Sequence, residues 1–327
     1  MKRAVAFMLL LFTLTHTVSH AADVVSASVT ADNGIYSYLL IGFDESEENT
    51  DALVIMSYNS RTNGLGVIQI PRDTYYKSKK SAKINRLYAS YLSEGREKTE
   101  ALELLTSDVS SAMGIKLRGY ASFTLEAFRR IIDAVGGVRL ELSEAMASRF
   151  NSLGMGLSFS EGANRLSGED ALYFVRFRSG YALSDITRLD AQKIFLRAMI
   201  SAVRSGMKPS VAFKLISCCG DGLKTNIGIG EILKLMLKNY SRIKDIKYSF
   251  FTLPGATVKN SDGIWYYSAC KSACYDSFLS LGIASFEFDK NGLMLYLLNE
   301  DFCNIYNSKE IKTRILSEDD LGDLVFY

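Results

Sequence analysis

Histidine is almost missing from this chain of 327 residues, because its two copies, His16 and His20, both lie near the start. Lys2 and Arg3, followed by an apolar stretch of about a dozen residues and then small residues, predict a cleaved secretory signal over 1–22. That stretch is shorter than the roughly 20 residues of a membrane-spanning helix, although a retained anchor is the alternative. We therefore expect an exported protein without histidine, which excludes Ser-His-Asp and Cys-His catalysis and histidine-ligated zinc.

An excess of one charge is also missing. The chain has 38 basic residues and 36 acidic ones, and removal of the signal would take away two basic residues and make the numbers equal. A globally basic nucleic-acid-binding protein is therefore disfavoured, and we expect no nucleic acid as partner. Any site for an anion must be a local concentration of cations.

Proline is rare, with three copies, and the chain contains no repeat or low-complexity stretch. Its 48% hydrophobic residues can bury one large core. After a polar linker at 23–34, we expect one globular domain over 35–284 and a C-terminal extension of unknown role over 285–327. The five cysteines are an odd number, and their pairing in an exported protein stays open.

Short β-rich runs alternate with helical patterns along the domain. Residues 36–42, 52–58 and 65–70 predict buried strands, and Asn63-Gly64 favours a hairpin between the last two. Further along, the pattern predicts helices at 99–113, 124–135, 185–203 and 229–240, and strands at 117–123, 138–142 and 247–253. A hairpin beside helical crossovers is typical of an α/β protein with a central mixed β-sheet.

Two aspartates stand at the ends of the first two predicted strands. Asp44 follows the first strand, and Asp51 immediately precedes the second. If these strands are neighbours, both carboxylates face a common cleft, where paired carboxylates suit Mg²⁺. The alternative is that both are turn or capping residues of an acidic loop.

Cationic residues follow the aspartates at separate places in the chain. They are Arg72, Lys83, Arg176, Arg178 and Arg188, and Gln192 shares a helix face with the last of them. Pro71 marks the exit of the third strand, so that Arg72 projects from its end. The planar fork of arginine suits a pyrophosphate, because it makes bidentate, charge-assisted hydrogen bonds. The alternative for the helical residues is a structural network of ion pairs.

Together these segments resemble the LytR-CpsA-Psr family of cell-wall glycopolymer phosphotransferases. The matching stretches are 39–44 (LLIGFD), 50–51 (TD), 70–73 (IPRD), 83–85 (KIN), 128–138 (FRRIIDAVGGV), 166–178 (LSGEDALYFVRFR), 185–188 (DITR) and 192–196 (QKIFL). Each stretch alone is a weak signal, but their order and spacing together are specific. The chain differs from the usual family pattern at Ala191, where an arginine is common, and in its short acidic loop at 45–50.

The resemblance implies an α-β-α sandwich with a hydrophobic groove for a polyprenyl chain, whose pyrophosphate lies with Mg²⁺ at an arginine-rich mouth. It implies transfer of a phosphate-linked glycopolymer from a polyprenyl-pyrophosphate carrier to peptidoglycan, at the outer face of the cytoplasmic membrane. By position, Asp44 and Asp51 would hold the metal or order the arginines. Pyrophosphate would be bound by Arg72, Lys83, Arg176, Arg178, Arg188 and Gln192, and catalysis would depend on Asp44, Asp51, Arg72, Arg176 and Arg178.

Two other functions fit the same residues. One is a secreted Mg²⁺-dependent pyrophosphatase that acts on lipid-linked substrates and uses water as the acceptor. The other is a non-catalytic protein that binds polyprenyl phosphate or the cell wall and acts in regulation.

Overall fold

The computed structural model describes residues 34–76, 83–177, 184–204, 220–228, 242, 245–259 and 263–282. The predicted signal, the predicted helix at 229–240, the C-terminal extension and Arg178 lie outside the described residues. Within the described part of the chain, no helix is long and apolar enough to cross a membrane.

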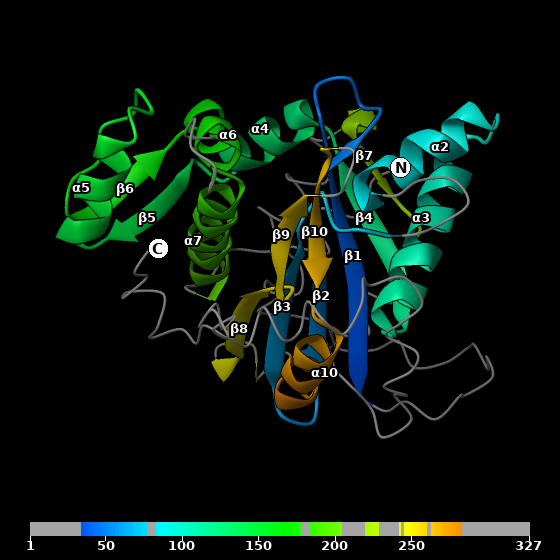
Figure 1. The fold of residues 1–327 in the computed structure, drawn as a ribbon. Helices are drawn as coiled ribbons and strands as arrows, with labels where there is room; N and C mark the ends of the chain where they lie inside the picture. The colour runs from blue at the N-terminus through cyan, green and yellow to red at the C-terminus, as the bar shows by residue number, and fades with distance from the viewer. Residues whose placement is uncertain are drawn as a thin grey trace, which may run out of the picture.

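A six-stranded mixed sheet occupies the centre of the molecule (Figure 1). In sheet order its strands are β7 (Leu223–Thr225), β4 (Leu117–Phe123), β1 (Ile35–Phe43), β2 (Thr50–Asn59), β3 (Gly64–Ile70) and β8 (Lys247–Thr252). Strand β2 is antiparallel to both β1 and β3, whereas β4 runs parallel to β1 and β8 parallel to β3. The predicted hairpin between β2 and β3 is confirmed, with Asn63 in the left-handed region at φ 57°.

Helices cover both faces of this sheet (Figure 1). One face carries α2 (Leu87–Ser93), α3 (Lys98–Met113) and α10 (Lys271–Ser280), and the other carries α4 (Leu125–Ala134), α6 (Gly168–Arg176) and α7 (Ser184–Arg204), while α5 (Glu144–Ser152) lies farther out, beside the ribbon of β5 and β6. Two antiparallel ribbons stand apart from the sheet, β5 (Val138–Leu142) with β6 (Gly162–Leu166) and β9 (Gly255–Lys259) with β10 (Trp265–Ala269). The short 3₁₀ helices are η1 (Ile84–Arg86) and η2 (Gly220–Gly222).

The side chains of β1 explain why the sheet has two covered faces. Tyr38 and Leu40 belong to the core beneath α4–α7, whereas Leu39 and Ile41 belong to the core beneath α2, α3 and α10. Successive side chains of a strand point to opposite faces, so a strand buried on both faces reads as a continuous apolar run. The predicted α-β-α sandwich with a mixed sheet is therefore confirmed.

Local signals set the ends of the helices that reach the functional edge of the sheet. A capping box begins α6, in which the Asp170 N–H donates to Ser167 Oγ at 3.1 Å and the Ser167 N–H donates to Asp170 Oδ2 at 3.3 Å. The Thr124 side chain caps α4 by accepting from the Ala127 N–H, and Gly136 and Gly137 follow that helix with positive φ. These ends position α4 and α6 against the sheet.

Some elements differ from the sequence prediction. Asp51 was expected just before the second strand, but it is the second residue of β2, because pairing with β1 continues as far as Thr50. Strand β5 was predicted, but it pairs with β6 in a separate ribbon. The sequence pattern did not predict α2, α5, α10, β6, β7 and the ribbon of β9 with β10, which are short and become stable through contacts with the rest of the fold.

Candidate functional site

One edge of the central sheet collects the predicted charged residues. The carboxyl ends of β1, β3, β4 and β8 and the start of β2 all lie at this edge, because of the strand directions described above. Asp44 follows β1, Asp51 opens β2, and Arg72 follows β3. In open α/β sheets, ligands bind outside the carboxyl ends of the strands. This edge is therefore the expected place for a site.

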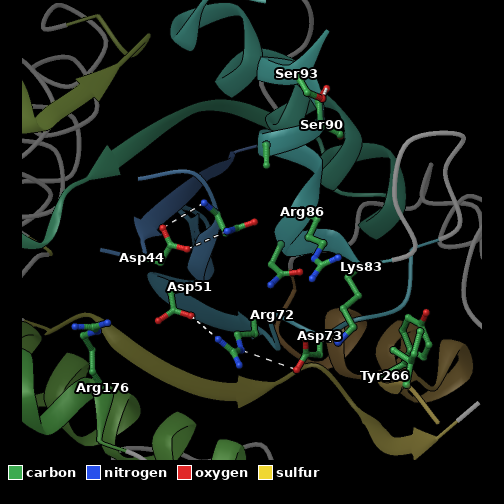
Figure 2. A pocket seen from close by; sticks show the side chains of 14 residues that line it. Asp44, Asp51, Arg72, Asp73, Lys83, Arg86, Ser90, Ser93, Arg176 and Tyr266 are labelled. Atoms are coloured by element: carbon green, nitrogen blue, oxygen red, sulfur yellow. Dashed lines mark hydrogen bonds and ion pairs between the residues drawn. The ribbon is translucent and has the colours of Figure 1, made fainter. Parts of the chain in front are cut away.

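A polar cavity of about 1400 Å³ opens there (Figure 2). Five predicted residues line it: Asp44, Asp51, Arg72, Lys83 and Arg176. The lining also includes Asn49, Asp73, Asn85, Arg86, Ala89, Ser90, Ser93, Ile264 and Tyr266. The structure thus brings together side chains from β2, α6 and three loops, which lie far apart in the sequence.

Asp51 is the shared partner of two arginines. Its Oδ1 lies 2.9 Å from Arg72 Nη1 and 3.4 Å from Arg188 Nη1. The Arg188 side chain is 2% exposed, so its charge requires a nearby counter-charge. Asp51 supplies that counter-charge and at the same time orients Arg72 toward the cavity. Arg188 does not line the cavity itself, and it acts on the cavity through its ion pair with Asp51.

The ion pairs continue along the cavity from Arg72 to Lys83 (Figure 2). Asp73 accepts a hydrogen bond from Lys83 Nζ at 2.8 Å, and its other oxygen lies 3.9 Å from Arg72 Nε. The side chains of all three residues are 20–30% exposed, so they remain accessible to a ligand. This alternation of acid and base holds two cations in place before any ligand arrives, which avoids an ordering cost on binding.

Asp44 is both a turn residue and a cavity residue, so the two sequence interpretations of this position are compatible. Ser46 Oγ donates to its Oδ1 at 2.8 Å, and Asn49 Nδ2 donates to its Oδ2 at 3.0 Å. Burial raises the pKa of the Asp44 carboxyl, but the hydrogen bonds from Asn49, Ser46 and the Glu48 N–H outweigh burial and hold that pKa below its ordinary value. Asp44 is therefore an ionised carboxylate at neutral pH.

Arg176, the last residue of α6, has an exposed partner. Its Nη1 lies 2.9 Å from Glu45 Oε1, and the Glu45 side chain is 78% exposed. Ion pairs at such exposed positions contribute at most about 1 kcal/mol. An incoming anion can therefore replace Glu45 on Arg176 at little cost.

A second, apolar cavity of about 150 Å³ lies between the sheet and helices α4, α6 and α7. Its apolar lining includes Leu40, Val54, Phe128, Ile132, Leu172, Phe195 and Leu196. Asp51 and Arg176 line both the apolar cavity and the polar cavity. The two cavities therefore meet at this charged pair of residues, which fits the groove and mouth that the family resemblance implied.

Gln192 lines the apolar cavity, and its hydrogen bonds join three elements. Its Nε2 donates to the Val175 carbonyl of α6 at 3.2 Å, and its Oε1 accepts from Gln69 Nε2 of β3 at 3.3 Å. Gln69, which the sequence analysis missed, is 1% exposed and also donates to the Leu189 carbonyl at 3.1 Å. These bonds hold the end of α6, and with it Arg176, against the sheet.

The carboxylates suit a hard cation that is bound together with a phosphate ligand. Among the described residues, no three His, Cys, Asp or Glu side chains gather closely enough to form a metal site by themselves. Asp44 and Asp51 nevertheless line the same cavity. Mg²⁺ is commonly held by one or two carboxylates, several waters and substrate phosphates. The donor set fits Mg²⁺ in that form.

Arg86, Ser90 and Tyr266 also line the polar cavity and were missed by the sequence analysis. Arg86 follows the 83–85 motif directly, so the motif itself was an available signal. Tyr266 comes from β10, far along the chain, and no sequence pattern connects it with the other residues.

Fold and site together define an α/β protein with an anion-binding cavity that meets an apolar cavity at the carboxyl edge of a mixed sheet. The model of the LytR_cpsA_psr family matches residues 12–278, and the chain belongs to the LytR-CpsA-Psr family. The predicted family, fold class and assignment as an enzyme are confirmed, since the curated relatives are transferases.

One such relative is the polyisoprenyl-teichoic acid–peptidoglycan teichoic acid transferase TagU of Bacillus mycoides. It is 30% identical over 253 residues, which are 73% of this chain and 75% of the relative. Among solved structures, protein gbs0355 from Streptococcus agalactiae has a TM-score of 0.62 at 21% identity and covers 84% of this chain and 96% of its own. TagT bound to LI-WTA has a TM-score of 0.60 at 21% identity, with 78% and 92% covered. These two structures show the same fold.

Proposed function

We propose that this protein transfers a phosphate-linked glycopolymer from a polyprenyl-pyrophosphate carrier to peptidoglycan. The observation that carries the proposal is the junction of the two cavities at Asp51 and Arg176. A ligand with an apolar chain and a pyrophosphate head needs an apolar space joined directly to cations. The acceptor and the polyprenyl carrier are those in the name of the Bacillus mycoides relative.

The apolar cavity and the polar cavity bind different parts of this donor. The isoprene units nearest the pyrophosphate enter the cavity beneath α4, α6 and α7, where Phe128 and Leu196 contact them. The pyrophosphate lies against Arg72, Lys83 and Arg176, whose charges offset those of its oxygens. Because the two arginines have planar forks, they also fix the orientation of the phosphate groups.

The transfer step exchanges the phosphoanhydride bond of the pyrophosphate for a phosphate ester bond to the acceptor. A hydroxyl oxygen of the acceptor forms a bond to the phosphorus that carries the glycopolymer. The bond from that phosphorus to the bridging oxygen breaks, and polyprenyl phosphate leaves with the electron pair. The hydroxyl proton passes to a cavity carboxylate, for which Asp44 and Asp51 are the two candidates. Such transfer depends mainly on positioning and charge stabilisation, so it requires no histidine.

Asp44 and Asp51 would also hold Mg²⁺ together with the phosphate oxygens. When bound, the ion supplies neutralisation of the negative charge on the pyrophosphate. Arg178 is proposed as a further pyrophosphate ligand from its position in the family motif. The leader at 1–22 would deliver the protein to the outer face of the cytoplasmic membrane, where lipid carrier and peptidoglycan meet.

The proposal is tested with the purified protein, a polyprenyl-pyrophosphoryl glycan, Mg²⁺ and soluble peptidoglycan fragments. Covalent glycan on the fragments is the expected product. Free polyprenyl phosphate without glycan on the fragments would instead identify a pyrophosphatase. Binding of the donor without any turnover would identify a non-catalytic protein, and either result would overturn the proposed transfer.

Arginine variants test the site itself. We expect Arg72→Ala and Arg176→Ala each to lower the turnover rate by about 10²–10³-fold, because each removes a charge that stabilises the transition state. Arg139→Ala is the matched control, since the Arg139 side chain is 70% exposed and forms its ion pair with Glu141 on the separate ribbon of β5 and β6. Circular dichroism checks that all three variants are folded. Turnover at the rate of the original protein in either cavity variant would refute the site assignment.

A further inference from the structure

The polar cavity has a second wall that the proposed pyrophosphate site does not use. This acceptor wall, as we name it, consists of Tyr266 of β10, Ile264 just before β10, Arg86 of η1, and Ser90 and Ser93 of α2. Figure 2 shows Tyr266 and Arg176 on opposite sides of the cavity, with Ser90 and Ser93 at a third position. The wall therefore stands opposite the end at which the apolar cavity joins.

Backbone hydrogen bonds fix the position of Tyr266 relative to the charged residues. The Tyr267 N–H donates to the Asp73 carbonyl at 2.8 Å, and the Tyr75 N–H donates to the Tyr267 carbonyl at 2.8 Å. The Tyr267 hydroxyl donates to the Leu253 carbonyl at 2.6 Å, so that side chain points into the protein. Because neighbouring side chains of a strand point in opposite directions, Tyr266 faces the cavity.

The ring of Tyr266 is itself held in place. Tyr75 meets it nearly edge-on, with 5.4 Å between ring centroids and an interplanar angle of 83°. Lys83 Nζ lies 5.4 Å from the ring centroid. The ring therefore directly adjoins a cation that we assign to the pyrophosphate. A group stacked on this ring would sit next to the reacting phosphate.

The chemistry of the acceptor wall suits a saccharide. A sugar ring has an apolar face of C–H groups that packs on an aromatic ring, and hydroxyl groups at its rim that require hydrogen-bond partners. Tyr266 and Ile264 offer the apolar surface, and Ser90, Ser93 and Arg86 offer hydrogen-bonding groups. Ser90 Oγ donates to the Leu87 carbonyl at 2.7 Å, which leaves its oxygen as an acceptor for a sugar hydroxyl.

We propose that the acceptor wall binds one saccharide unit of the peptidoglycan glycan chain, stacked on Tyr266. In this position a hydroxyl of the bound sugar faces the end of the cavity that holds Arg72 and Asp51. The identity of the acceptor rests on the proposed function, whereas the binding itself requires no turnover. Tyr266 is then the residue that separates transfer to a glycan from transfer to water.

The test measures binding first. The probe is a tetrasaccharide of alternating N-acetylglucosamine and N-acetylmuramic acid, titrated by calorimetry into the full-length protein. We expect Tyr266→Ala to raise its Kd about tenfold, as truncation of a well-packed aromatic anchor typically does, and Tyr266→Phe to leave it within about twofold. Trp265→Ala is the matched control, because Trp265 is 54% exposed, neighbours Tyr266 and points to the other side of the strand. The Kd of the tetrasaccharide for Trp265→Ala should equal its Kd for the original protein.

Kinetics then separate this inference from the proposed function. We expect Tyr266→Ala to raise the KM for the acceptor about tenfold, and Tyr266→Phe, which keeps the ring beside Lys83, to leave that KM within about twofold. If Tyr266→Ala does not fold, Ser93→Phe obstructs the opposite side of the wall and should give the same rise in KM. Inorganic pyrophosphate should bind Tyr266→Phe and Ser93→Phe as tightly as the original protein, because both variants keep the ring beside Lys83.

Each outcome decides one of the two proposals. Failure of the original protein to bind the tetrasaccharide, or equal loss of binding in Trp265→Ala, overturns the acceptor wall. Glycan transfer with an unchanged acceptor KM in Tyr266→Ala overturns it as well, while the proposed function stands. Tetrasaccharide binding that depends on Tyr266, without any transfer, supports the acceptor wall and overturns the proposed function.

Discussion

Replacement of Asp51 by asparagine should destabilise the protein and at the same time strengthen its binding of anions. Asp51 is the counter-charge of the buried Arg188, at 3.4 Å, and of Arg72, at 2.9 Å. At an effective dielectric constant of about 20, the first of these pairs has a Coulomb energy of about 5 kcal/mol. Measured losses after removal of one partner of a buried pair are about 3–5 kcal/mol. Asparagine keeps a hydrogen-bond acceptor, so we expect the free energy of unfolding to fall by about 3 kcal/mol, at the lower end of that range.

Urea unfolding with and without inorganic pyrophosphate measures both effects. A loss of about 3 kcal/mol corresponds to a decrease in Tm of about 6 °C for a domain of this size. The variant leaves two guanidinium groups without their shared carboxylate, and a bound pyrophosphate restores negative charge beside them. Ligand that binds the folded state alone stabilises it in proportion to its affinity. Pyrophosphate should therefore raise the stability of Asp51→Asn by more than that of the original protein.

Asp73→Asn is the matched control, because it makes the same change in the same cavity. The Asp73 side chain is 30% exposed, and its partner Lys83 is 20% exposed, so the expected loss of stability is below about 1 kcal/mol. A loss of stability in Asp51→Asn no larger than that in Asp73→Asn would show that Asp51 is not the required counter-charge of Arg188. Weaker stabilisation of Asp51→Asn than of the original protein by pyrophosphate would show the same.

Three further predictions concern other parts of the two cavities. Leu196→Trp fills the apolar cavity, so calorimetry should show the affinity for polyprenyl phosphate to fall at least about tenfold while inorganic pyrophosphate binds as before. Leu196→Met, which conserves the side-chain volume, is the control. Glu45→Gln frees Arg176, so pyrophosphate should bind about two- to threefold more tightly, and Glu48→Gln in the same loop should change nothing. The pKa of Asp44 in the folded protein lies below its ordinary value of 3.8, so the ionised carboxylate stabilises the protein above pH 3.8. This contribution disappears as the pH falls through the lowered pKa. Urea unfolding should therefore show Asp44→Asn to be less stable than the original protein at pH 7 but not in strong acid.

The sequence predicted those parts of the site that depend on strand ends. Strand β1 is a continuous apolar run, and Asn63 provides the left-handed backbone of the hairpin, so both are encoded locally. Once those strands pair, Asp44 and Arg72 necessarily reach the same edge. The sequence alone therefore predicts which edge of the sheet carries these charged residues.

The remaining features depend on contacts between distant segments. Helical spacing placed Arg188 and Gln192 on one face, but it could not show that Gln69 would hydrogen-bond to Gln192 or that Arg188 would be 2% exposed behind Asp51. The position of Tyr266 depends on the backbone bonds of Tyr267, which join two segments with no shared pattern. Such pairings are decided by the packing of the whole fold.

The ion pairs of the cavity also determine the order in which an anion can replace them. Among the described residues Glu45 is the ion-pair partner of Arg176, and because its side chain is 78% exposed it is the weakest partner and leaves first. Asp51 is 17% exposed, and its departure would separate it from Arg188, which is buried and needs that charge. Asp51 therefore stays, and Arg72 stays oriented by it, while Arg176 moves onto the ligand. A chain with almost no net charge can in this way keep a cation-rich cavity ordered until a pyrophosphate enters.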